Sequence, residues 1–333
     1  MVTMEDIAIE LGCSINTVSK ALNNKPDVSP KTRKLVLDTA RKMGYVPNAL
    51  AKSLVTRSSG TLGIVVPSVT VSIYAELVEY IMKRASKKGY DTFLAISSDS
   101  EEDEVAAIEG LYQKRVDGLI VVPVSAKPSY HETLTAFKQP LVYACNSVDM
   151  PDAYFVGQRL EDCAYTVAQH LIDQGCRKIA LLCSTRAGVD SSVETGYRRC
   201  LADNGLPVND EDVFRPEIAL RPRDSGHEVA KMMDERIDEF DGVLLENEEL
   251  YFGLNSLADN HGLYIPDDLL VAAAVGLGSN KSRLLSLTSI GIDPEEICEE
   301  ALDCLSDQIR NGDDAKKHQP IVGKLIVRKS SRR

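Results

Sequence analysis

The sequence predicts a small N-terminal domain of three short helices, followed by a core of two doubly wound, parallel-sheet α/β subdomains. Helix start and stop signals crowd the first 46 residues. Beyond residue 60, short apolar runs alternate with amphipathic helical patterns, as in parallel sheets covered by helices. Charge divides the chain near the same place: residues 1–57 hold nine Lys and Arg against five Asp and Glu, and the rest holds 29 against 45. A head of charge +4 on a body of charge −16 indicates that the head meets a polyanion.

The composition is that of a globular protein with room for two or three domains, because 333 residues contain 44% hydrophobic and 26% charged positions. No run of about 18 apolar residues occurs, which excludes a membrane-spanning helix. The N-terminus, "MVTMEDIAIE", has neither the basic start nor the apolar stretch of a signal peptide. We therefore expect a cytoplasmic protein with no membrane partner.

The cysteines and histidines show no pattern of metal ligation. Eight Cys contain no C-x-x-C pair, and the five His are scattered. Buried free thiols in a reducing cytosol explain the Cys better than disulfides or zinc do. No metal and no cofactor is expected.

Each helix of the N-terminal domain has an identifiable beginning. Thr3 stands three residues before Asp6, which is the spacing of a capping box. The other signals are the caps Ser14 and Ser29-Pro30 and the terminating Gly12 and Gly44. The expected apolar stripes are Ile7, Ala8 and Leu11; Ile15, Val18, Ala21 and Leu22; and Leu35, Val36, Ala40 and Met43. Two helices about three residues apart, closed by a third, form the helix-turn-helix layout.

The remaining elements follow from alternating patterns. A segment starting at Asn48, "NALAKSL", is too short to be a stable helix alone, and "TRSSG" is a link. The first set of strands is expected at 62–67, 90–96, 116–123 and 140–146, with a helix over 74–89. The second set is expected at 153–157, 178–183, 241–246 and 269–275, with helices over 163–175 and up to Asn204. The chain finishes with 286–293, a helix from Pro294, and 324–331.

Several motifs carry a family resemblance. The stretch from Thr3 to Leu54 resembles the N-terminal domain of the LacI/GalR family of bacterial transcription regulators almost position for position. "RVDGLIVVP", "HLIDQGCRKIALL", "ETGYRRCL", "LTSIGIDPEEI" and "LIVRKSS" resemble its core. The resemblance implies a homodimeric repressor with a periplasmic-binding-protein-like core that holds an effector in a cleft. It implies major-groove binding by the second helix and minor-groove binding by paired hinge helices on a double-stranded DNA operator.

The resemblance also implies domain boundaries. Residues 1–46 are the expected helix-turn-helix domain, and 47–59 the hinge helix and linker. Residues 60–333 are the expected effector-binding and dimerisation core. Its N-subdomain comprises about 60–158 and 291–318, and its C-subdomain about 159–290 and 319–330.

Residues expected to contact DNA come from the family pattern. Ile15, Asn16 and Lys20 correspond to base-facing positions, where amide and ammonium groups can bind base edges. Leu54 corresponds to a leucine inserted into a base step, which kinks the duplex. Lys20 and Lys52 replace the family's more usual Arg, and Lys lacks the bidentate fork. The remaining expected contacts are Thr3, Ser14, Thr17, Ser19, Asn23, Lys31 and Asn48.

The effector cleft departs from the pattern of sugar-binding relatives. Four positions that are polar in those relatives are Cys145, Arg159, Val193 and Val275 here. We therefore do not expect a typical sugar. The other candidate effector residues are Ser68, Ile73, Tyr74, Ser125, Asn146 and Asn247 with Glu248. A less polar ligand, an anion meeting Arg159, and control by a protein partner all stay open.

An enzyme is the contrasting class, together with a solute-binding protein whose head is incidental. "VGLGSNKSRLL" at 275–285 lacks the third glycine of a dinucleotide loop, because position 281 is Lys. No phosphate-binding loop or nucleophile elbow is present. The sequence therefore predicts a regulator and no catalytic residues.

Overall fold

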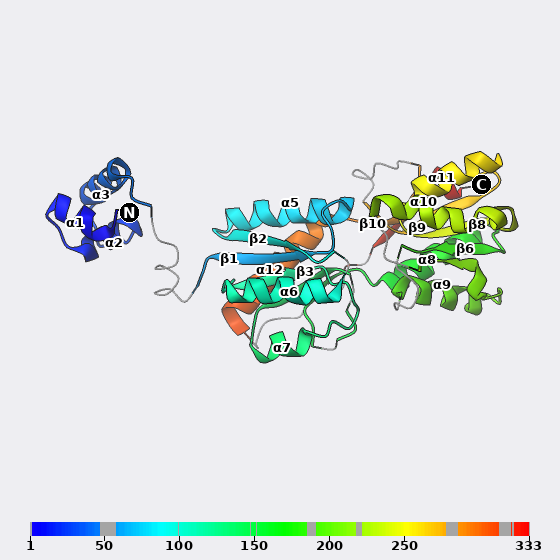
Figure 1. Ribbon diagram of the computed structural model, residues 1–333, viewed down its shortest axis with the longest axis horizontal. Coiled ribbons are helices and arrows are strands. Elements are labelled where there is room, and N and C mark those ends of the chain that lie inside the picture. Colours follow the sequence, from blue (N-terminus) through cyan, green and yellow to red (C-terminus); the bar gives the residue numbers. More distant parts are fainter. Residues whose placement is uncertain are drawn as a thin grey trace. The chain divides into compact units, whose positions relative to one another are not determined.

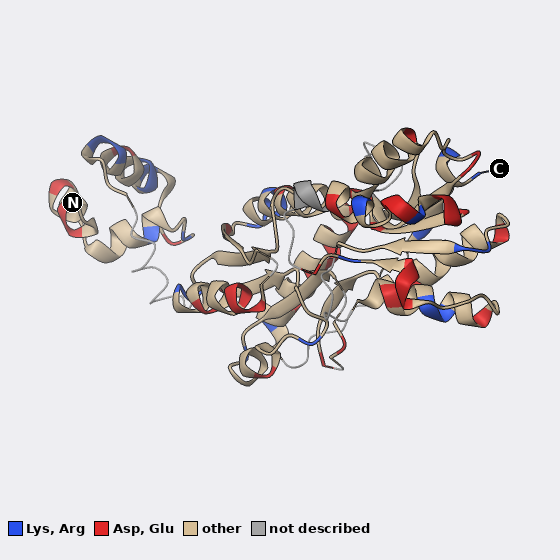
Figure 2. Cartoon of the chain, turned by 45° about the vertical axis from the view of Figure 1, so that its right-hand side comes forward, with Lys and Arg blue, Asp and Glu red and all other residues tan. Residues whose placement is uncertain are grey.

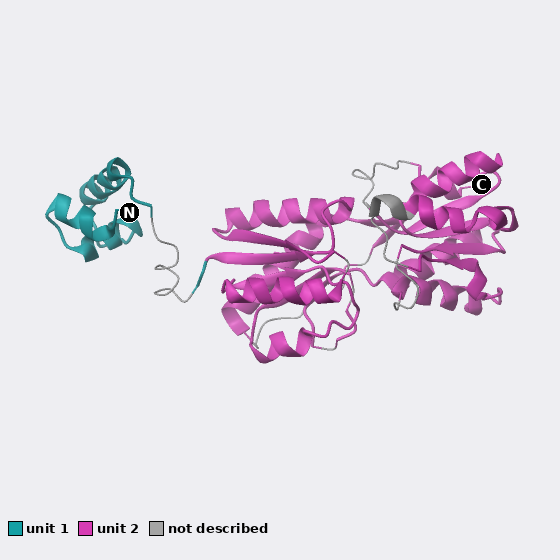
Figure 3. Cartoon of the chain, in the orientation of Figure 1, with its two compact units in different colours: residues 1–59 teal, residues 60–333 magenta. Residues whose placement is uncertain are grey.

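A computed structural model describes the chain (Figure 1). The described residues are 2–46, 58–98, 100–146, 148–150, 152–184, 191–217, 222–277, 286–312, 321 and 323–332. The chain divides into two compact units, residues 1–59 and 60–333 (Figure 3).

The first unit contains three helices, α1 (Met4–Leu11), α2 (Ile15–Leu22) and α3 (Pro30–Met43). The predicted caps are confirmed. Thr3 and Asp6 form a reciprocal capping box, in which the Thr3 amide donates to Asp6 Oδ2 at 2.8 Å. Ser14 and Ser29 cap the next two helices. Gly12 and Gly44 end α1 and α3 with φ of 62° and 70°, a backbone conformation that glycine adopts without strain.

Fewer residues are buried in the core of this unit than the predicted apolar stripes contain. Leu35 is 55% exposed, because Val36 and Ala40 form the buried row of α3 and Leu35 lies one residue off it. Ile15 is 46% exposed at the first position of α2, where only Val18 and Ala21 are buried. Both residues were wrongly assigned to the core. The buried cluster is Ile7, Ala8, Val18, Ala21, Val28, Val36 and Ala40.

The first sheet of the second unit is parallel throughout, in the order β2-β1-β3-β4-β5. Helices α5 and α12 pack on one face, and α6 and α7 on the other (Figure 1). The strands are β1 (Thr61–Val66), β2 (Asp91–Ile96), β3 (Gly118–Val121), β4 (Leu141–Cys145) and β5 (Phe155–Gly157). The helices are α5 (Ser72–Lys87), α6 (Glu101–Gln113), α7 (His131–Ala136) and α12 (Pro294–Asn311).

Two predictions about this sheet were wrong. The strand expected at 153–157 belongs here and not to the second set, because β5 pairs with β4. The prediction that helices cover both faces fails at the edge strand β2. Phe93, Leu94 and Ile96 there are 46%, 41% and 47% exposed, although consecutive residues point to opposite faces.

The second sheet has the order β11-β10-β9-β8-β6-β7, with only β11 antiparallel among the described pairs. Helices α8 and α9 pack on one face, and α10 and α11 on the other. The strands are β6 (Ile179–Leu182), β7 (Val213–Phe214), β8 (Gly242–Asn247), β9 (Leu270–Leu277), β10 (Thr288–Ile292) and β11 (Lys324–Ile326). The helices are α8 (Leu160–Asp173), α9 (Ser192–Asp203), α10 (Pro222–Met232) and α11 (Leu250–His261), with 3₁₀ turns at Asp210–Asp212, Asp234–Glu239 and Lys329–Ser331.

No described helix is long and apolar enough to cross a bilayer. Among the described residues, no group of His, Cys, Asp and Glu could hold a metal ion. All eight cysteines are free thiols, and all except the partly exposed Cys13 are buried.

Close helix packing in the second sheet's subdomain depends on Gly196. A Cβ built at this position of α9 would lie 2.0 Å from the Glu161 carbonyl oxygen of α8. We expect Gly196→Ala to lower the free energy of unfolding by about 1–3 kcal/mol, because one of the helices must shift. Urea unfolding measures this. The matched control is Gly110→Ala in α6, where a Cβ meets nothing within 4 Å and the helix gains up to about 1 kcal/mol. Equal stability of the two variants would contradict the packing argument.

Candidate nucleic-acid interface and effector cleft

Helix α2 presents a polar face beside its two buried apolar residues. Asn16 and Asn23 are exposed, and Thr17, Ser19 and Lys20 are partly exposed. The hydroxyls at the start of the helix are already engaged: Ser14 Oγ accepts from the Thr17 amide at 3.1 Å. Asn16 and Lys20 are therefore the α2 side chains best suited to bind base edges.

Lys20 has a partner that the sequence analysis did not identify. Its Nζ lies 2.5 Å from Oδ2 of Asp27, in the loop between α2 and α3. The hydrogen bond from Lys20 lowers the pKa of the Asp27 carboxyl. The polar face of α2 thus contains an ion pair rather than a lone cation.

Charge is unevenly distributed over the first unit. Figure 2 shows basic residues on α3 and acidic residues on α1. Thr3, Ser14, Ile15 and Lys31, four of the predicted DNA contacts, are exposed. Three further predicted contacts, Asn48, Lys52 and Leu54, and residues 47–57 of the predicted hinge segment lie outside the described residues.

The carboxyl edge of the first sheet gathers several predicted effector residues. Ser68, Ser125 and Asn146 follow β1, β3 and β4 respectively, and parallel strands end at the same edge. Asn146 Nδ2 donates to the Pro123 carbonyl at 2.9 Å and to the Tyr74 hydroxyl at 3.3 Å. Tyr74 and its neighbour Ile73 also pack on the core beneath. The edge therefore offers hydroxyl and amide groups beside an aromatic ring.

The second sheet contributes a separate polar group. Asn247 Nδ2 donates to Ser184 Oγ at 3.0 Å, and the Ser184 hydroxyl and amide both donate to Glu246 Oε2. The Asn247 Oδ1 atom is buried with no hydrogen-bond partner among the described residues. Sequence reasoning missed Ser184 and Glu246, although Ser184 follows a strand just as Ser68 does.

The four positions predicted to differ from sugar-binding relatives lie in different environments. Cys145 is buried in a left-handed conformation (φ 63°), and burial raises its thiol pKa to about 12, so the thiol stays neutral. Val193 is 1% exposed within the core of α9, which removes it from the candidate effector residues. Val275 packs against the hydrophobic clusters of both subdomains. Arg159 is exposed at the start of α8.

A carboxylate of the second subdomain interacts with an element of the first. Glu249, which precedes α11, is close enough to the backbone amide of Ser72, the first residue of α5, for this amide to favour the charged carboxylate. The N-cap residue of α5, Val71, has no side-chain acceptor for the first amides of the helix. Burial raises the pKa of Glu249. The two residues are far apart in sequence, so no local pattern indicated this contact.

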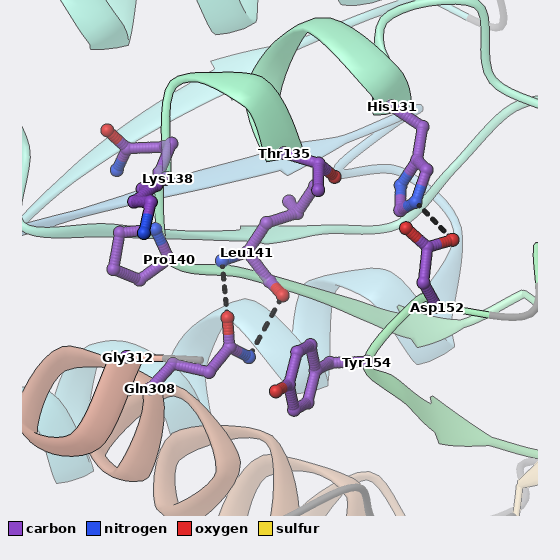
Figure 4. Close-up of a pocket in the computed structure, with 10 residues that line it drawn as sticks. His131, Thr135, Lys138, Pro140, Leu141, Asp152, Tyr154, Gln308 and Gly312 are labelled. Atoms are coloured by element: carbon purple, nitrogen blue, oxygen red, sulfur yellow. Dashed lines mark hydrogen bonds and ion pairs between the residues drawn. The ribbon is translucent and has the colours of Figure 1, made fainter. Parts of the chain in front are cut away.

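A cavity of about 170 Å³ lies beside the start of β4 (Figure 4). Its polar lining is largely occupied by internal hydrogen bonds. Gln308 pairs with the Leu141 amide and carbonyl at 3.0 Å each. His131 lies 3.0 Å from the Tyr143 hydroxyl and 3.1 Å from Asp152 Oδ1. These hydrogen bonds occupy polar atoms that line the cavity and leave few of them for a ligand.

Comparison with known proteins agrees with this geometry. Residues 3–48 match the model of bacterial regulatory proteins of the lacI family, and residues 168–331 match the periplasmic binding protein-like domain. Catabolite control protein A of Priestia megaterium is 30% identical over 288 residues, covering 86% of this chain and 84% of its own. The chain belongs to the LacI family.

Other LacI-family members match over nearly the whole length. The repressor PurR of Mannheimia succiniciproducens is 26% identical over 99% of this chain and 98% of its own. A crystal structure of the lac repressor dimer bound to operator and the anti-inducer ONPF has a TM-score of 0.83 at 22% identity, covering 100% and 99% of the two chains. These relatives are transcriptional regulators and not enzymes. The chain is accordingly a LacI-family transcriptional repressor with a DNA-binding domain.

The raised pKa of Glu249 makes a stability prediction. A folded-state pKa above the ordinary value of 4.5 means that the folded protein holds this proton more tightly. Its contribution to stability is therefore lost as pH rises from 4.5 through the raised pKa. Glu249→Gln keeps an acceptor for Ser72 and removes the desolvated charge. We expect melting at pH 7 to rise by about 2 °C and its dependence on pH to flatten.

Differential scanning calorimetry from pH 4.5 to 8 tests this, with Glu79→Gln on the exposed face of α5 as the control. A lower melting temperature for Glu249→Gln at every pH would show instead that the charge itself stabilises the contact.

Proposed function

We propose that this LacI-family protein is a homodimeric repressor of a pseudo-palindromic operator, with DNA affinity set by an effector in the cleft. The observation that carries the proposal is the exposed polar face of α2, on a capped helix in a unit of net positive charge. A target on chromosomal DNA fits a cytoplasmic protein.

Helix α2 has the groups that a major-groove helix needs. Asn16 can pair with adenine, Lys20 with guanine O6 and N7, and exposed Ile15 can contact a thymine methyl group. Helix α3 adds cations for phosphates, among them Lys31. The leucine at position 54 supplies an apolar wedge for the minor groove, which bends the operator.

Dimerisation is supported by the surface that β2 leaves open. An edge strand with apolar side chains exposed on both faces invites association, and proteins usually cover such edges. Phe252 on α11, 57% exposed, gives the second subdomain an apolar surface as well. A two-fold partner would place two recognition helices about 34 Å apart, one turn of DNA.

The cleft chemistry favours a neutral effector with hydrogen-bond donors. Glu246, Glu248 and Glu249 surround Asn247 in the sequence at the end of β8, and this local negative charge disfavours an anion. The Asn247 Oδ1 atom, which has no hydrogen-bond partner in the described part of the chain, is an acceptor. An effector that disturbs the Glu249–Ser72 contact would shift the two subdomains and so change DNA affinity.

Selection of bound fragments from a random DNA library tests the operator proposal. We expect the protein to enrich a symmetric site. Its affinity should fall steeply with salt, because its Lys and Arg side chains displace counterions that are condensed on the DNA. Asn16→Ala should lose this enrichment while non-specific binding persists. Enrichment of no sequence, or of an asymmetric one, would contradict the proposal.

Dimerisation through β2 predicts that Leu94→Lys is monomeric at concentrations where the native chain is dimeric. An uncompensated charge buried in the interface should raise the dimer Kd by about a hundredfold or more. Sedimentation equilibrium measures this. Val208→Lys, at a 38% exposed position of the second subdomain, is the control and should stay dimeric. A dimeric Leu94→Lys protein would place the interface elsewhere.

A further inference from the structure

The loop between α2 and α3 holds an acidic side chain against the recognition helix. Asp27 Oδ2 lies 2.5 Å from Lys20 Nζ, and both side chains remain accessible, at 51% and 42%. Within residues 2–46 this is the one ion pair. Sequence spacing alone did not indicate it, because the two residues are seven apart and belong to different elements.

The loop is braced, so Asp27 occupies a defined place. The Lys25 amide donates to the Lys20 carbonyl at 3.0 Å. Arg33 of α3 donates to the Lys25 carbonyl at 2.5 Å and to the Val28 carbonyl at 3.4 Å. Val28, the next residue after Asp27, is buried in the core of the unit. Hydrogen bonds therefore fix the backbone on both sides of the carboxylate.

A carboxylate at this place changes what Lys20 can bind. A lone ammonium is a flexible point charge that associates with any phosphate. Lys20 and Asp27 together carry little net charge, and the carboxylate repels phosphate oxygens. A base edge is different, because the guanine acceptors O6 and N7 carry no formal charge and are repelled less by the carboxylate.

We propose that Asp27 is a specificity-determining residue: it acts through Lys20, which it positions for a guanine and keeps away from phosphates. The proposal rests on the DNA-binding function proposed above. It predicts one G·C base pair in each half-site whose recognition depends on both residues.

The test compares Asp27→Ala with Asp38→Ala, which removes an exposed carboxylate of α3 that has no ion pair within residues 2–46. Affinities are measured for the selected operator, for its single-base variants and for unrelated DNA, over a salt series. For Asp27→Ala we expect the preference for G·C at one symmetric position to fall about fivefold, within the range of a base contact. Affinity for unrelated DNA should rise. The slope of log K against the logarithm of salt concentration should be steeper by about 0.9, because the freed Lys20 adds one phosphate contact. Asp38→Ala should change no single position.

A double variant separates positioning from general charge. In a Lys20→Met background, Asp27→Ala should cause no further change in base preference at that position. Asp27→Asn, which keeps the side-chain shape, should act in the same direction as Asp27→Ala, and thermal unfolding checks that each variant is folded.

Equal effects of Asp27→Ala at all base pairs, or the same profile as Asp38→Ala, would overturn the proposal. A position-specific effect that persists without Lys20 would also overturn it. Failure of the native protein to enrich any symmetric site would instead reject the proposed function itself.

Discussion

Parallel strand pairing is the constraint on which the larger unit depends. Because β1, β3 and β4 run in one direction, the loops that follow them meet at one edge and bring Ser125 and Asn146 together. The same rule collects Ser184 and Asn247 at the edge of the second sheet. The placement of these polar groups is therefore a consequence of strand direction, and the strands themselves can be almost wholly apolar.

Local signals were sufficient for much of the fold. Caps at Thr3, Ser14 and Ser29 have short-range physical causes, so the helix boundaries of the first unit follow from the sequence. Apolar runs likewise indicated most strands. The failures depend on what lies beside a residue: β5 joins the first sheet because of its pairing with β4, and Leu35 is exposed because its neighbour occupies the core.

The candidate sites divide in the same way. Residues directly after strands, such as Ser68 and Asn146, could be predicted because position along the strand determines their place. Asp27 and Glu249 could not, because each acts on a partner from another element. Val193 was misplaced for a related reason: alignment by motif fixes its position on α9 but not its burial.

Carboxylates in this chain hold the backbone as much as they repel polyanions. Asp241 accepts from the amides of Arg177 and Lys178, and Glu104 accepts from the Val124 amide, just before Ser125. Charge-assisted bonds to amides are stronger than neutral ones, so these acids fix the loops at strand ends. Glu249 extends the same chemistry across the two subdomains. Its partner is a backbone amide, which needs only an acceptor, so a neutral Gln at position 249 can keep the interaction without the desolvated charge.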